Sequence, residues 1–196
     1  MDLENEKECD KDKSKEDGIS GKLLKTRIIL ISDTIDKKLA EKVISQLLLL
    51  EQEDPDKGIK MFINSPGGDA DAGFAILDMI KFVKPTITTI CAGVTASAAV
   101  IILLGGIKND RFSLPNARIL IHQPSTGVQG SASDIQIEAS EIIKCRNKIN
   151  KLMAKETGQS IERVENDTRR NLWMSAEEAL DYGLISKIIK TRKDLE

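Results

Sequence analysis

The chain has 196 residues, of which 40% are hydrophobic and 31% charged, so it is long enough for one domain with a sizeable core. Its net charge of −2 and its 3% aromatic content disfavour a nucleic-acid-binding protein, because such proteins need excess cations or stacking surfaces. One histidine and three cysteines that lie 82 and 54 residues apart do not match the ligand spacing of a zinc site. The odd, scattered cysteines favour a reducing compartment, so we expect a cytoplasmic protein.

The N-terminal segment is acidic and polar. Residues 2 to 17 contain eight acidic residues and four lysines, with no apolar stretch of the signal-peptide type. Such a composition cannot bury enough apolar surface to fold alone. We therefore expect a charged, disordered arm over residues 1–21 and a single domain over residues 22–192.

Strand and helix signals alternate along the rest of the chain. Apolar and β-branched runs predict four strands: Arg27–Ile31, Ile59–Asn64, Thr86–Cys91 and Ile119–His122. Amphipathic or apolar runs predict helices over Lys37–Glu53, Ala70–Val83, Ala98–Leu104 and Asp134–Glu156, and shorter ones after Ser160 and Ser175. Asp36 is expected to cap the first helix, and Ser133 with Gln136 and Ser175 with Glu178 to form capping boxes. The alternation predicts an α/β fold with parallel strands and crossover helices.

One uncharged run of 23 residues, from Pro85 to Ile107, is long enough to cross a membrane. It contains several threonines and glycines, and it divides into a β-branched piece and a later apolar piece. A strand followed by a buried helix explains this division better than a single span. We therefore expect no membrane segment.

Three junctions that follow predicted strands carry residues that could take part in catalysis or binding. The turn Ser65-Pro66-Gly67-Gly68 either aims free N–H groups at a developing oxyanion or is an ordinary tight turn. Ser97, at a helix start, is a nucleophile or a helix cap. His122 is the one histidine, so it is the candidate base near neutral pH unless its role is structural. Loops after parallel strands collect at one sheet edge, which favours a shared site.

Several motifs in order resemble the ClpP family, the serine peptidase subunits of the Clp protease. These motifs are Ile63-Asn64-Ser65-Pro66-Gly67-Gly68, Ala96-Ser97, Leu114-Pro115-Asn116, Ile121-His122-Gln123-Pro124, Thr157-Gly158-Gln159-Ser160 and Ser175-Ala176-Glu177-Glu178-Ala179. The resemblance runs from about Leu23 to Ile189. It implies a ClpP/crotonase-like fold of repeated β-β-α units with a protruding handle helix. It also implies two stacked seven-membered rings that enclose a chamber fed by an AAA+ ATPase.

The resemblance also implies roles for single residues. Ser97 matches the nucleophile and His122 the general base, while Gly68 and Ala98 match the residues whose N–H groups form the oxyanion hole. The helix from Asp134 matches the handle, and residues 127–130 match a handle strand that lines the substrate groove. No metal or organic cofactor is implied. The implied function is a serine endopeptidase that cleaves peptides and unfolded proteins through an acyl-enzyme.

The third position of the catalytic triad departs from the family pattern. The family carries an aspartate 49 residues after the histidine, and this chain has Asn171 there. Asparagine keeps the shape of the side chain but lacks the charge that stabilises an imidazolium. In a well-studied serine protease the same exchange lowers turnover about 10⁴-fold. We therefore expect Asn171 to orient His122 and the chain to be a weak peptidase on its own.

Other departures concern assembly. Arg169 and Arg170 replace an Asp-Arg pair that bridges the rings in relatives, and two cations cannot make that pair with an identical ring, so a second ClpP paralogue is expected opposite. Lys60 and Phe62 replace tyrosines of the pocket that docks the ATPase, which leaves direct docking on this chain open. Asp69, beside the oxyanion glycine, is expected to disfavour acidic peptides.

Two other functions are compatible with the same residues. The chain could be a largely inactive structural or regulatory subunit that completes a mixed ClpP assembly, as Asn171 and Arg169 favour. It could also be a crotonase-type acyl-CoA enzyme, because that fold uses backbone oxyanion holes too. Asp69, Asp71 and the lack of a basic CoA-binding stretch disfavour this last alternative.

Overall fold

Helix α2 (Ile19–Lys25) is the first element of the computed structural model, which describes residues 18–195. Most of the predicted arm over residues 1–21 lies outside the described residues. Its last three residues, 19–21, belong to α2, so the helix begins inside the segment that composition assigned to the arm. The helix contacts strand β1 and buries none of its own residues.

Within residues 18–195, seven strands form one sheet. Strands β1 (Ile28–Ile31), β2 (Ile59–Ser65), β3 (Ile87–Ala96), β4 (Arg111–Ser113) and β7 (Lys187–Ile188) are neighbours in that order, and all pair in parallel. Strand β5 (Arg118–Ile121) pairs in parallel with the far end of β3, and β6 (Leu172–Met174) pairs with β5 in antiparallel fashion. The predicted α/β class is confirmed. Strands β4, β6 and β7, which are two or three residues long, are additions to the prediction.

Strand β3 runs five residues further than predicted because it changes partner along its length. Its first half pairs with β2 and β4, and its last three residues pair with β5, with Val94 opposite Arg118. Between these halves, the register with β2 shifts, and the Asn64 side chain accepts a hydrogen bond from the Val94 N–H at 2.9 Å. This irregular extension carries the chain to Ser97.

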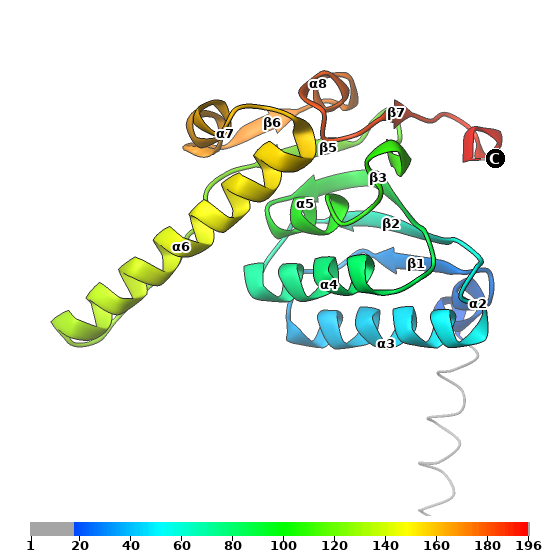
Figure 1. Ribbon diagram of the computed structural model, residues 1–196, viewed down its shortest axis with the longest axis horizontal. Coiled ribbons are helices and arrows are strands. Elements are labelled where there is room, and N and C mark those ends of the chain that lie inside the picture. The colour runs from blue at the N-terminus through cyan, green and yellow to red at the C-terminus, as the bar shows by residue number, and fades with distance from the viewer. Residues whose placement is uncertain (1–17, 196) are drawn as a thin grey trace, which may run out of the picture.

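Three helices, α3 (Lys37–Glu53), α4 (Ala70–Phe82) and α5 (Ala98–Leu103), pack in sequence beside the sheet (Figure 1). Asp36 caps α3 as predicted, accepting from the Leu39 N–H at 2.7 Å. All six residues of α5 are buried, so β3 and α5 together account for most of the uncharged run. Among the described residues, no helix combines the length and apolarity that a bilayer crossing requires.

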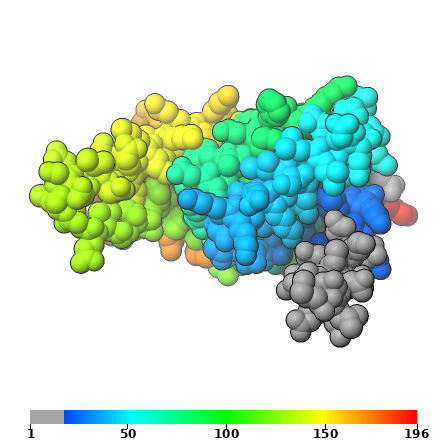
Figure 2. Space-filling model, turned by 90° about the horizontal axis from the view of Figure 1, so that it is seen from below, coloured from blue at the N-terminus to red at the C-terminus, as the bar shows by residue number. Residues whose placement is uncertain are grey.

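Helix α6 (Ala132–Thr157) projects away from the sheet, and its N-terminal half stands out at one end of the molecule (Figures 1 and 2). Its buried residues, Ile149, Asn150, Met153 and Thr157, all lie near its C-terminal end. The predicted capping box of Ser133 and Gln136 is wrong. Ser131 is the cap and Asp134 its partner, because the helix begins two residues earlier and the Asp134 carboxylate reaches back to the Ser131 N–H at 3.1 Å.

The chain then returns to the sheet through α7 (Ile161–Thr168) and α8 (Ala176–Tyr182). The capping box of Ser175 and Glu178 is confirmed. Residues 127–130, which the resemblance assigned to a handle strand, form no strand in the described chain. A strand needs a partner for its N–H and C=O groups, and this segment pairs with none of the described strands.

Candidate active site

Ser97 sits on a strained turn between β3 and α5. Its backbone has φ 55° and ψ −120°, a conformation that a residue with a side chain rarely adopts. Such strain costs about 1–3 kcal/mol and persists where the surroundings impose it. The Ser97 N–H donates to the Leu120 carbonyl at 3.0 Å, which ties the turn to β5. The Ser97 hydroxyl makes no capping hydrogen bond to α5, so the alternative of a simple helix cap is wrong.

The turn through Gly67 and Gly68 lies directly against Ser97. Gly67 has φ 93° and Gly68 has φ 149°, both in the region that favours glycine. A Cβ on Gly67 would stand 2.7 Å from the Ser97 Cβ, and one on Gly68 would stand 2.2 Å from the Ile35 carbonyl oxygen. These close approaches account for both glycines, of which Gly67 lies against Ser97 and Gly68 against Ile35.

The two amides expected to form an oxyanion hole are free to bind a ligand. Within residues 18–195, the Gly68 N–H meets no hydrogen-bond acceptor, although the flanking Ile35 N–H and Asp69 N–H are both engaged. Ala98 is the first residue of α5, and an N–H at that position has no partner within its own helix. Both N–H groups are therefore available to a developing negative charge.

His122 and Asn171 meet across the β5–β6 pair. Ile121 is opposite Leu172 in the antiparallel register, so the next residues outward, His122 and Asn171, face each other. His122 Nδ1 lies 3.1 Å from Asn171 Oδ1. Because an amide oxygen only accepts, this contact puts the ring proton on Nδ1 and leaves Nε2 with a lone pair. The imidazole is half-buried and the asparagine exposed.

Four of the five residues predicted for the site line one cavity of about 460 Å³: Gly68, Ser97, Ala98 and His122. Asn171 stands behind His122, outside this lining. The remaining wall is largely apolar and includes Leu120, Ile149 and Met153, which arrive from β5 and α6. Within the described residues, no hydrogen bond joins the Ser97 hydroxyl to His122, and no cluster of three His, Cys, Asp or Glu side chains could hold a metal ion.

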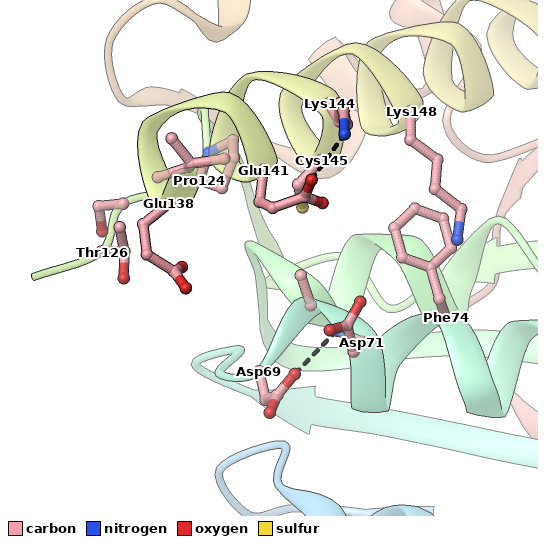
Figure 3. Close-up of a pocket in the computed structure, with 13 residues that line it drawn as sticks. Asp69, Asp71, Phe74, Pro124, Thr126, Glu138, Glu141, Lys144, Cys145 and Lys148 are labelled. Carbon is pink, nitrogen blue, oxygen red and sulfur yellow. Dashed lines mark hydrogen bonds and ion pairs between the residues drawn. The ribbon is translucent and has the colours of Figure 1, made fainter. Parts of the chain in front are cut away.

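A second cavity of about 380 Å³ continues the first between α4 and α6, and the two share Asp69, Ala70 and residues 124–126. Figure 3 shows Glu138 extending from α6 toward the start of α4, where Asp69 and Asp71 lie, and Glu141 turned along α6 toward Lys144. The sequence drew attention to Asp69 and Asp71. It did not reveal Glu138 or Glu141, because nothing local indicates that the helix crosses over α4.

The basic side chains of this second cavity are already engaged. Lys144 pairs with Glu141 at 2.6 Å, and the Lys148 ammonium lies 3.7 Å from the centre of the Phe74 ring. Burial, followed by the negative charge of Asp71, raises the pKa of the Cys145 thiol in the same wall. Asp69, Asp71 and Glu138 are in no ion pair within residues 18–195, so the cavity presents net negative charge.

Lys60 and Phe62, the departures expected at the docking pocket, line a separate cavity of about 210 Å³. Its wall is mainly apolar and includes Ile28, Leu114 and Ile189. Lysine and arginine side chains border this wall, from Lys60, Lys190 and Arg192.

Comparisons with known proteins identify the family of the chain. The family model described as Clp protease matches residues 11–192. The ATP-dependent Clp protease proteolytic subunit 2 of Treponema denticola is 52% identical over 180 residues, which cover 92% of this chain and 90% of that protein. A solved structure of ClpP1 from Listeria monocytogenes, an asparagine-to-aspartate mutant, superposes with a TM-score of 0.84 at 47% identity, covering 91% of this chain and all of that one. The chain therefore belongs to the Clp protease family, a family of serine-type peptidases, as its motifs predicted.

Proposed function

We propose that the chain is a serine endopeptidase subunit of an ATP-dependent Clp protease, which cleaves unfolded polypeptides inside a ring chamber. The observation that carries this proposal is the uncapped, positive-φ Ser97, which shares a cavity with His122 and two free backbone N–H groups. An activated nucleophile, a base and an oxyanion site are the three parts that acyl transfer needs.

In the proposed reaction the Ser97 Oγ attacks the substrate carbonyl while its proton passes to His122 Nε2. The carbonyl oxygen takes up the negative charge and accepts from the Gly68 and Ala98 N–H groups. Collapse of this intermediate breaks the C–N bond, and the leaving amine takes the proton back from His122. A water molecule then repeats the sequence on the acyl-enzyme, with His122 again as the base, and frees Ser97.

Asn171 sets the strength of the base in this scheme. Its Oδ1, 3.1 Å from Nδ1, selects the tautomer in which Nε2 accepts the serine proton. A neutral amide stabilises the imidazolium of the transition state less than a carboxylate does. The isolated chain is therefore proposed to be a weak peptidase.

The charge of the cavities supports a preference among substrates. Asp69 borders both the catalytic cavity and its continuation, and Asp71 and Glu138 add negative charge further along. A bound peptide that carries Asp or Glu beside the cleaved bond would meet like charge. We propose that the subunit disfavours acidic peptides.

The proposal extends to assembly. Proteins of the Clp protease family form ring oligomers that work with Clp ATPases. We propose a double heptameric ring in which a second ClpP paralogue supplies the opposite ring, because Arg169 and Arg170 are exposed and in no ion pair within residues 18–195. The apolar cavity at Phe62, which Lys60 also lines, is the proposed docking place of an AAA+ ATPase. A single peptidase domain over residues 22–192 and a cytoplasmic location complete the proposal.

A second candidate function is a largely inactive structural or regulatory subunit. It is favoured by the missing hydrogen bond between Ser97 and His122 and by the neutral Asn171. The two candidates differ in one property, which is whether Ser97 is activated.

Fluorophosphonate labelling of the purified protein separates these functions. The active subunit is modified at Ser97, mapped by mass spectrometry, and His122→Ala abolishes the adduct. The same measurement with a second ClpP paralogue reports activation by a partner ring. Absence of an adduct in both preparations would overturn the peptidase proposal and leave the structural subunit.

A further inference from the structure

The position of Asn171 depends on how helix α7 ends. The helix finishes at Thr168, and the last carbonyls of any helix lack partners within it. Here one residue supplies two of the missing donors. The Gln123 backbone N–H donates to the Thr168 carbonyl at 2.6 Å, and the Gln123 side-chain Nε2 donates to the Arg169 carbonyl at 3.0 Å.

These bonds close a small ring around the candidate catalytic pair. Gln123 directly follows His122, and Arg169 precedes Asn171 by two residues. The His122–Asn171 contact therefore closes one end of the ring, and the amide of Gln123 closes the other. A single neutral hydrogen bond between partly exposed groups contributes little by itself. The distance between His122 Nδ1 and Asn171 Oδ1 therefore depends on the two hydrogen bonds of Gln123 as much as on the His122–Asn171 contact itself.

The far side of the same turn is fixed to the projecting helix. The Thr168 hydroxyl donates to the Val164 carbonyl at 2.7 Å and lies 3.1 Å from Asn150 Oδ1 on α6. Thr168 and Asn150 are each 1% exposed, so this anchor is in the interior. With Thr168 held in the core and Leu172 held in register with Ile121, the Gln123 bonds are the remaining hold on the turn that carries Asn171.

We propose that Gln123 is a positioning residue for peptide cleavage. Its side-chain amide holds the C-terminal turn of α7 so that Asn171 Oδ1 stays within hydrogen-bonding distance of His122 Nδ1. This inference rests on the proposed roles of His122 and Asn171 and adds a residue to them. Gln123 does not line the catalytic cavity, so it acts on the reaction through Asn171.

The first test is Gln123→Met, which keeps the length of the side chain and the backbone N–H but removes the Nε2 donor. We expect kcat to fall about fivefold to tenfold with KM unchanged, as for the loss of one hydrogen bond that orients the base. Gln159→Met is the matched control, because Gln159 Nε2 donates to the carbonyl of Tyr182, the last residue of α8, at 2.9 Å. It removes the same kind of bond from another helix end and is expected to leave kcat unchanged.

A double-mutant cycle separates positioning from general destabilisation. In an Asn171→Ala background, Gln123→Met is expected to cause no further loss of kcat, because nothing is left for the turn to position. An equal loss of kcat in both backgrounds, or an equal loss in the Gln159→Met control, would overturn the proposal.

The single histidine allows a readout that needs no catalysis. In protein carrying ¹³C,¹⁵N-histidine and Ser97→Ala, the one imidazole signal reports how fully the proton occupies Nδ1. Gln123→Met is expected to shift this signal toward that of Asn171→Ala, and Gln159→Met to leave it in place. An unmoved signal in Gln123→Met would overturn the positioning role. A moved signal, combined with no fluorophosphonate adduct in the protein that retains Ser97, would support positioning while the peptidase proposal fails.

Discussion

The two halves of the candidate site are built in opposite ways. Ser97 stands between buried neighbours, Ala96 and Ala98, and the glycine turn beside it cannot accept a Cβ. His122 and Asn171 stand at the open ends of two short strands, and Asn171 is exposed. The Ser97 half is therefore preformed by the core, whereas the His122 half depends on a surface turn. This contrast teaches that activity is regulated most readily through the histidine, because moving the serine would require the core to move.

The largest effect is expected from Ser97, the proposed nucleophile. Ser97→Ala removes the attacking oxygen without disturbing the fold, and we expect peptide hydrolysis to fall by at least about 10³-fold. Ser133→Ala is a suitable control, because Ser133 is exposed on α6 and is not its cap. Hydrolysis of a fluorogenic peptide measures the difference, and activity that survives in Ser97→Ala would place the nucleophile elsewhere.

Gly68→Ala disturbs the backbone beside Ser97, in the half of the site that the core holds in place. The new Cβ would stand 2.2 Å from the Ile35 oxygen at a positive φ, so the turn must shift and the Gly68 N–H must leave its place. We expect about 10²-fold lower kcat and about 2–4 kcal/mol lower stability. Gly127→Ala serves as the stability control in thermal unfolding, since a Cβ there meets no atom within 4 Å. Equal melting temperatures for the two variants would contradict the steric argument.

Asn171→Asp sharpens the comparison from the other half. A carboxylate opposite Nδ1 stabilises the imidazolium, and we expect kcat to rise tenfold or more, with about 10⁴-fold as the upper bound. Asn166→Asp adds the same charge on the exposed surface of α7 and is expected to leave kcat unchanged. If the wild type and Asn171→Asp turn over equally, the neutral amide is no handicap.

The cavity that continues the catalytic one tests whether charge acts on substrates. Asp71→Asn removes one carboxylate from its wall, and we expect KM for a peptide with an acidic side chain to fall about twofold to fivefold. A matched basic peptide should show the opposite change. Equal KM changes for both peptides would show that the charge of this cavity does not determine which peptides are preferred.

The smallest expected effect concerns labelling of the cysteine thiols. Labelling of a cysteine in β3 reports local opening of the strand that leads to Ser97. Burial raises the pKa of Cys91, in β3, to about 12, so its reactive thiolate is nearly absent at pH 8. Cys145 is only half-buried. We expect a maleimide to modify Cys145 well before Cys91 when adducts are mapped by peptide mass spectrometry. Equal labelling rates would mean that the strand carrying Ser97 opens as readily as the surface.

Sequence motifs indicated which residues to consider for the candidate site better than they indicated the geometry around them. Ser97, His122 and Gly68 could be located because each lies in a motif next to a strand end. Strand β6 could not, since three residues give no periodic signal and its pairing with β5 comes from far along the chain. The start of α6 was ambiguous because two nearby serines both precede polar residues at the capping distance. The hydrogen bonds of Gln123 could not be predicted for a different reason. Their acceptors are backbone carbonyls, which every residue has, so no pattern of side chains indicates them.

The solvent-exposed part of α6 has a consequence for how the protein responds to its own concentration. Between residues 132 and 148 the helix buries no side chain, although it exposes Ile135, Ile137 and Ile143. Most of the stability of a helix in a protein comes from tertiary packing of its apolar face, and this segment has little of it. If another subunit covers these isoleucines in the proposed assembly, packing of this segment and subunit association share one equilibrium, and dilution loosens the segment. Hydrogen exchange in residues 132–148 would then slow as the protein concentration rises, and the segment would act as a gauge of how much assembled protein is present.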